Sequence, residues 1–113
     1  MRVVVFGAGA TGQLFGARFL RAEHEVLLIA RPEEVVAIRG HGLRVEGETE
    51  GVFPVPIVDA LIDGITPDLL VLTVKSYDVE KAGEEIGARL RPIPPLLATQ
   101  NGLGIEAALR RGI

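Results

Sequence analysis

The chain has 113 residues, 48% of them hydrophobic and 4% aromatic, and no cysteine. This composition suits one domain with an aliphatic core, and it excludes disulfides, thiolate catalysis and a cysteine-based metal site, so we expect no bound metal. The net charge of −3 and the scattered basic residues argue against a nucleic-acid partner. The chain has no apolar run of roughly 20 residues and starts on a strand, so we expect a cytoplasmic protein without a membrane partner.

The first residues carry the most informative pattern. A run of strand-forming residues, 1–6, leads directly into a glycine-rich turn, and an apolar helix is predicted over residues 13–21. The turn consists of Gly7, Ala8, Gly9, Ala10, Thr11 and Gly12. A strand, a turn with this glycine spacing and a helix commonly hold the pyrophosphate of a dinucleotide.

Each glycine of this turn has its own physical role. Gly7 permits the sharp turn after the strand, since a residue without a Cβ reaches backbone angles closed to others. A side chain at Gly9 would stand between the backbone N–H groups and the phosphate oxygens. Gly12, with Gly16 one turn later, lets the helix pack closely on the strand and direct its N-terminus at the anion. The alternative is a tight turn without a ligand, but a second apolar strand at residues 25–30 completes a βαβ unit and favours a nucleotide.

The end of the second strand indicates which dinucleotide is bound. In NAD and FAD sites an acidic residue there accepts hydrogen bonds from the ribose. Here the strand is followed by Arg31, nineteen residues after the last glycine of the turn. An arginine accepts no hydrogen bond but can clamp a 2′-phosphate, which favours NADPH. The alternative is a solvated arginine; Glu33 and Glu34 rank below Arg31 as cofactor contacts, because they follow a proline and begin the next helix.

The middle of the chain predicts an insertion in the α/β pattern. A weaker helix over residues 33–39 is followed by residues 43–57, which alternate apolar and polar side chains around a glycine-bounded turn. This alternation predicts an antiparallel hairpin, with Pro54 and Pro56 placing its second limb at an edge. Residues 59–63 form at most a short helix.

The second half returns to alternating strands and helices. The predicted elements are a strand at 68–74, a helix at 79–90, a short strand at 96–99 and a last helix from Ile105. The first of these strands is almost wholly apolar and belongs in the sheet centre, while Gly83 and Gly87 weaken the helix that follows. The fold class is therefore α/β: a Rossmann-type, doubly wound, mostly parallel sheet with an inserted antiparallel hairpin and helices on both faces.

Four candidate site elements lie where strands end. They are the glycine turn, Arg31, Lys75 and Asn101. Ligands of open α/β sheets bind beyond the carboxyl ends of the strands, so these elements converge on one crevice. Lys75 is either a cation near the nicotinamide or an exposed lysine. Asn101 is either an amide that meets the nicotinamide or substrate, or part of an Asn-Gly turn.

The combined pattern resembles the ketopantoate reductase, or 2-dehydropantoate 2-reductase, family. The resemblance covers the whole chain and is most specific in two segments: Val74, Lys75, Ser76 and Tyr77, and Gln100, Asn101, Gly102, Leu103 and Gly104. The resemblance implies reduction of ketopantoate to pantoate with NADPH, in pantothenate and coenzyme A biosynthesis. It assigns the pyrophosphate to the glycine turn, the 2′-phosphate to Arg31, the nicotinamide end to Lys75 and Asn101, and substrate contact also to Asn101.

The resemblance also implies a second domain that residues 1–113 do not include. Members of the family continue into a helical catalytic domain that supplies the proton-donor lysine and most contacts to the small 2-keto acid. Residues 1–113 therefore correspond to the N-terminal NADPH-binding domain, we assign no catalytic residue within them, and we expect the chain alone to bind cofactor without turnover. The alternatives are a free-standing NADP(H)-binding or sensing module and a reductase of another 2-keto acid; a homo-oligomer is possible in each case.

Overall fold

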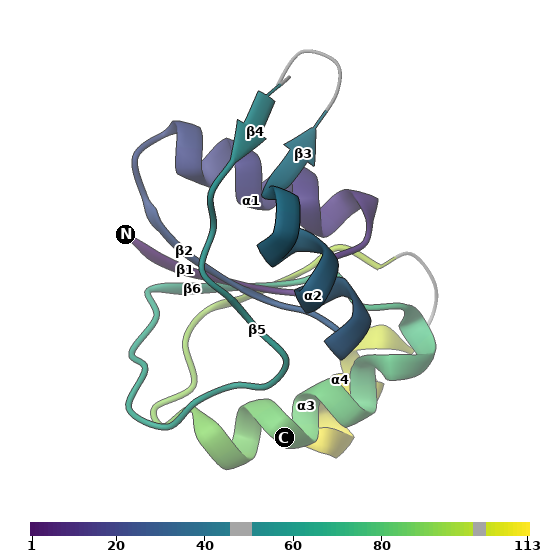
Figure 1. Ribbon diagram of the computed structural model, residues 1–113. Helices are drawn as coiled ribbons and strands as arrows, with labels where there is room; N and C mark the ends of the chain where they lie inside the picture. The colour runs from purple at the N-terminus through teal and green to yellow at the C-terminus, as the bar shows by residue number, and fades with distance from the viewer. Residues whose placement is uncertain (46–50, 101–103) are drawn as a thin grey trace.

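The computed structural model describes residues 1–45, 51–100 and 104–113 (Figure 1). The elements in chain order are β1 (Arg2–Phe6), α1 (Ala10–Arg21), β2 (Glu25–Ile29), α2 (Pro32–His41), β3 (Leu43–Val45), β4 (Gly51–Phe53), β5 (Ile57–Val58), β6 (Leu69–Leu72), the 3-10 turn η1 (Ser76–Asp78), α3 (Val79–Arg89), β7 (Leu96–Ala98) and α4 (Ile105–Gly112). Within the described residues no helix is both long and apolar enough to span a membrane.

Five strands form one parallel sheet in the order β5-β2-β1-β6-β7. Val4 of β1 lies at the centre, in register with Leu27 of β2 on one side and Leu70 of β6 on the other. From β1 the chain first builds outward through α1 and β2, and it later returns to place β6 on the opposite side of β1. The order therefore reverses between β1 and β6, and the carboxyl ends of such strands open a crevice.

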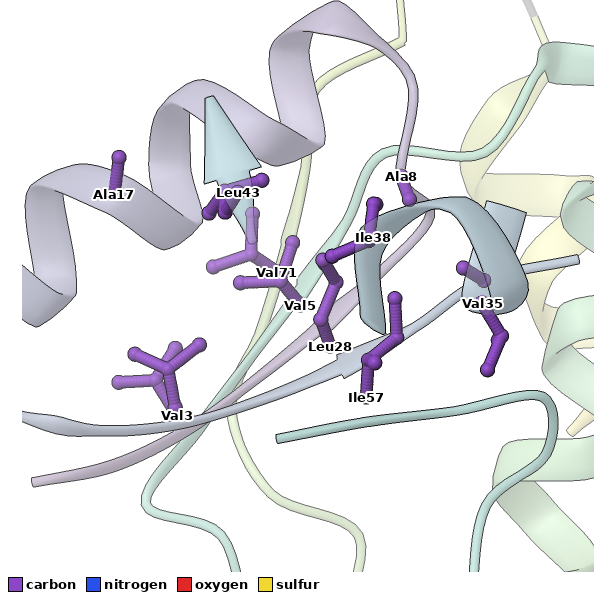
Figure 2. Packing of buried hydrophobic residues seen from close by; sticks show 12 residues of the cluster. Val3, Val5, Ala8, Ala17, Leu28, Val35, Ile38, Leu43, Ile57 and Val71 are labelled. Carbon is purple, nitrogen blue, oxygen red and sulfur yellow. The ribbon is translucent and has the colours of Figure 1, made fainter. Parts of the chain in front are cut away.

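Two hydrophobic clusters sandwich this sheet, as expected for parallel strands that are buried on both faces. Figure 2 shows one cluster, in which Val5 and Leu28 of the sheet lie beneath Ile38 of α2 and near α1. The other cluster joins Leu70 of the sheet to Ile86 of α3. Helices α1 and α2 thus cover one face, and α3 and α4 cover the other (Figure 1). This confirms the predicted arrangement of helices.

The inserted segment differs from its prediction. Strands β3 and β4 pair antiparallel, with Leu43 opposite Phe53, and residues 46–50 between them lie outside the described residues. The second limb does not continue to residue 57, because β4 ends before Pro54, which has no N–H to donate to a ladder. Ile57 instead begins β5, which pairs parallel with β2 at the edge of the main sheet and buries its side chain. Burial of this side chain in the main core explains the change of sheet.

The structure adds detail to two further predictions. Residues 59–63 form no helix; the backbone N–H of Leu61 donates instead to the Glu85 carboxylate of α3 at 2.9 Å. Helix α3 is continuous through Gly83 and Gly87; Gly83 faces α4, and Gly87 faces Ile113 just after it. A Cβ on Gly83 would lie 2.9 Å from the carbonyl oxygen of Leu109. These glycines therefore permit close packing of the two helices, a role that outweighs their weak helix propensity.

Candidate functional site

A pocket of about 510 Å³ lies at the carboxyl ends of β1, β2 and β6, beside the point where the strand order reverses. Its walls are the glycine turn, the start of α2, the segment after β6 and the first turns of α3. The predicted site residues that line it are Gly7, Ala8, Gly9, Ala10, Thr11, Arg31 and Lys75. Gly12 lies buried next to this wall, and Asn101 lies outside the described residues, so its role stays a prediction.

Gly7 and Gly12 are required by contacts within the protein itself. Gly7 has a φ of +122°, and a Cβ there would lie 2.5 Å from the hydroxyl oxygen of Thr73. A Cβ on Gly12 would collide with the carbonyl oxygen of Gly7. The backbone N–H of Gly7 donates to the carbonyl of Ile29 at 2.8 Å, which joins the turn to β2. The sharp turn expected at Gly7 and the close packing expected at Gly12 are therefore present.

Gly9 is different, because no described protein atom requires it. It is the N-cap of α1, its backbone is extended with φ −71° and ψ −172°, and a Cβ would have no atom of the described residues within 4 Å. Gly9 lines the pocket. Helix α1 has no capping side chain and no acidic residue in its first turn, although the N–H groups there have no partner within the helix. This end of the pocket therefore suits an anion such as a pyrophosphate.

Thr73 holds the glycine turn in place and was not predicted. Its hydroxyl donates to the carbonyl oxygen of Gly7 at 2.9 Å and lies 3.2 Å from that of Phe6, while its backbone N–H donates to Phe6 at 2.8 Å. The carboxyl end of β6 is thereby tied to the start of the turn. A single hydroxyl inside an otherwise apolar strand is the signal that could have revealed this residue.

Arg31 lies at the rim of the pocket, between β2 and α2. Its guanidinium forms an ion pair with Asp78 at 3.5 Å, and the two side chains are 60% and 37% exposed. The nearby hydroxyl of Tyr77 and, after it, the charge of Asp78 raise the pKa of Arg31 above its ordinary value, so the guanidinium stays charged. The backbone N–H of Arg31 donates to the Glu34 carboxylate at 3.1 Å, which engages Glu34 at the start of α2.

Lys75 and Gln100 lie on neighbouring segments after β6 and β7. The Lys75 side chain is exposed and lines the pocket. The amide of Gln100 donates to the carbonyls of Leu72 at 3.1 Å and of Val74 at 2.7 Å, so the two segments are held together. The residue that follows Gln100 in the chain is Asn101. Sequence reasoning used Gln100 only as part of a motif and missed this bridging contact.

Helix α3 contributes a charged wall that sequence reasoning also missed. Asp78, Lys81 and Glu85 all line the pocket, and their spacing of three and four residues places them on one helical face. The spacing of these charged residues, which follow Lys75 in the sequence, is the signal that could have predicted this wall. The charged lining is mixed: Arg31, Lys75 and Lys81 are basic, and Glu34, Asp59, Asp78 and Glu85 are acidic. Glu34 and Glu85 each accept a hydrogen bond from a backbone N–H, so these two acids support the wall.

The match to known proteins extends over nearly the whole chain. The family model described as ketopantoate reductase PanE/ApbA matches residues 3–113. The 2-dehydropantoate 2-reductase of Pyrococcus horikoshii is 35% identical over 106 residues, which cover 94% of this chain and 35% of that protein. The chain therefore spans about a third of the length of the curated relatives it matches.

Solved structures agree with the sequence comparison. A PanE/ApbA family ketopantoate reductase from Ralstonia eutropha JMP134 superimposes with a TM-score of 0.86 at 36% identity, over 97% of this chain and 37% of that one. D-mandelate dehydrogenase, solved with NADH and anilino(oxo)acetate, gives a TM-score of 0.88 at 30% identity, over 100% of this chain and 38% of that one. These likenesses confirm the predicted Rossmann-type α/β fold.

Proposed function

This chain belongs to the ketopantoate reductase family, PanE/ApbA, and we propose that it is the NADPH-binding domain of an oxidoreductase similar to 2-dehydropantoate 2-reductase. The proposed substrate is a small 2-keto acid, ketopantoate, which is reduced to pantoate in pantothenate and coenzyme A biosynthesis. The observation that carries the proposal is the open space at Gly9, next to the uncapped N-terminus of α1. Its position at the strand-order reversal is where dinucleotides bind in this fold.

Each part of the cofactor has a proposed contact. The residues from Gly7 to Thr11 would bind the pyrophosphate through backbone N–H groups, helped by the dipole of α1. Arg31 would bind the 2′-phosphate at the rim. Lys75 and Asn101 would meet the nicotinamide end, and Asn101 would also contact the substrate. When bound, NADPH supplies the hydride that reduces a keto carbon.

The described residues position and orient the cofactor, and the proposal assigns them no catalytic residue. Thr73 and Gln100 keep the pocket walls in place, which supports orientation of bound groups. The proton donor is expected in the helical domain of the family, so the 113-residue chain alone is proposed to bind without turnover. A cytoplasmic location and a homo-oligomer stay predictions.

A reductase of another 2-keto acid is the second candidate. The observation that favours it is the alignment of D-mandelate dehydrogenase, solved with NADH, over the entire chain. A free-standing NADP(H)-binding or sensing module would use the same pocket. The three functions share dinucleotide binding, and they differ in the keto acid that is reduced, if any.

Calorimetric titration with NADPH tests the shared step. We expect Gly9→Ala to weaken NADPH binding at least tenfold, or about 1.4 kcal/mol, because the methyl group enters the pyrophosphate cradle. Gly40→Ala is the matched control, since Gly40 is an exposed residue of α2 and a Cβ there also meets no atom of the described residues within 4 Å. Thermal unfolding checks that both variants fold. Failure of the unmodified chain to bind NADPH or NADH, or equal binding by both variants, would contradict the proposed site.

A further inference from the structure

The charge around Arg31 presents a problem for a 2′-phosphate site. A phosphate bound by Arg31 would approach a guanidinium that already has a carboxylate partner, Asp78, at 3.5 Å. Both residues line the pocket, so the carboxylate lies on the same side as the incoming ligand. Asp78 therefore acts on the phosphate in two ways, by occupying the guanidinium and by repelling a second negative group.

The geometry of the pair shows whether Asp78 holds the Arg31 guanidinium firmly or can be displaced from it by another anion. Charge-assisted N–H···O bonds are usually about 2.7–2.9 Å long, and Arg31 and Asp78 are connected by one contact of 3.5 Å between exposed groups. Exposed pairs of this kind contribute little to stability. A contact this long and this solvated is one that a phosphate can displace.

Two of the other acids of the pocket are less suited to this role. The carboxylates of Glu34 and Glu85 accept backbone hydrogen bonds from Arg31 and Leu61, which hold Glu34 at the start of α2 and tie Glu85 of α3 to the segment after β5. Asp78 precedes α3 without forming a side-chain cap, and within the described part of the chain its side-chain hydrogen bond goes to the Arg31 guanidinium.

We propose that Asp78 competes with the 2′-phosphate of NADPH for the guanidinium of Arg31, and thereby sets how strongly the site prefers NADPH over NADH. The inference rests on the proposed function, since it concerns the same pocket. Asp78 is a specificity-determining residue in this scheme: it lowers NADPH affinity, whereas NADH, without the 2′-phosphate, is unaffected. The unmodified site therefore prefers NADPH less than Arg31 alone would permit.

Binding of NADPH and NADH to Asp78→Asn tests the proposal. We expect NADPH to bind about three- to tenfold more tightly, the scale of one exposed ion pair together with one phosphate repulsion. NADH affinity should stay within about twofold on the same scale. Asparagine retains the ability to precede a helix, so the variant should fold. Asp63→Asn is the matched control, because Asp63 forms an exposed ion pair with Arg89 at 3.1 Å outside the pocket and loses the same charge.

A second pair of variants tests whether the effect acts through Arg31. In an Arg31→Gln background, Asp78→Asn should improve NADPH binding by a smaller factor than in the unmodified chain, because the phosphate repulsion is still relieved but there is no guanidinium to release. The proposal is overturned if Asp78→Asn leaves NADPH affinity unchanged or weakens it, or if Asp63→Asn or NADH shows the same gain. A full gain in the Arg31→Gln background overturns it as well. In each of these outcomes the unmodified chain still binds dinucleotide, so the proposed function stands independently.

Discussion

The hydroxyl of Thr73 donates to the carbonyl oxygen of Gly7 at 2.9 Å, between residues 66 positions apart in the sequence. This bond joins the carboxyl end of β6 to the first residue of the glycine turn, across the strand-order reversal. Gly7 also has a positive φ and no room for a Cβ beside Thr73. Thr73 therefore contacts Gly7 both at its carbonyl oxygen and at the position of the missing Cβ. The shape of the proposed phosphate cradle thus depends on a residue outside the glycine motif.

Replacing Thr73 by valine should affect both stability and binding. The variant keeps the side-chain shape but removes the donor to Gly7, so we expect the free energy of unfolding to fall by about 1–2 kcal/mol. NADPH should bind several-fold more weakly, because the turn loses a positional restraint. Chemical denaturation and calorimetry measure the two effects. Thr73→Ser retains the hydroxyl and should preserve NADPH affinity; a valine variant that matches the serine variant in binding would argue against this role of the hydroxyl.

Arg31→Glu should abolish the cofactor preference. We expect the unmodified chain to bind NADPH at least about tenfold more tightly than NADH, since a charge-assisted hydrogen bond contributes roughly 1.5–3 kcal/mol. The glutamate cannot bind a phosphate and repels it, so the ratio should fall to one or below. Arg89→Glu makes the same change of charge at an exposed ion pair outside the pocket and should leave the ratio unchanged. Equal affinities for the two dinucleotides in the unmodified chain would remove Arg31 from the proposed specificity.

Gly83→Ala should separate α3 from α4. The added Cβ would lie 2.9 Å from the carbonyl oxygen of Leu109 and 3.3 Å from the Cα of Gly112, both backbone atoms that cannot rotate away. Overpacking of this kind costs about 1–3 kcal/mol, which exceeds the gain of up to about 1 kcal/mol from replacing a helical glycine. We therefore expect a lower midpoint of thermal unfolding for Gly83→Ala.

Gly40→Ala provides the reference for that measurement. It makes the same substitution in a helix where, within the part of the chain that the structure describes, no atom lies within 4 Å of the new Cβ, so the propensity gain remains. The difference between the two variants isolates the cost of helix packing. Equal stabilisation by both would show that α4 moves without cost.

Features that depend on neighbouring residues could be predicted from the amino-acid sequence. Apolar runs located the strands, glycine spacing located the turn after β1, and these patterns together predicted a parallel sheet with helices on both faces. They also placed Arg31 and Lys75 at strand ends, where parallel strands necessarily bring their carboxyl ends to one edge. Local propensity and sheet topology sufficed for these predictions.

Features that depend on contacts between distant segments were visible only in the folded chain. The sequence pattern carried residues 43–57 through one hairpin, but burial of Ile57 in the main core diverts the chain into β5. It treated Gly83 as a weak point, although a distant helix requires the absence of a side chain there. The pairing of Asp78 with Arg31 likewise joins residues 47 positions apart. Such choices depend on which surfaces meet in three dimensions, because packing and charge act through space and periodicity along the chain reports only local geometry.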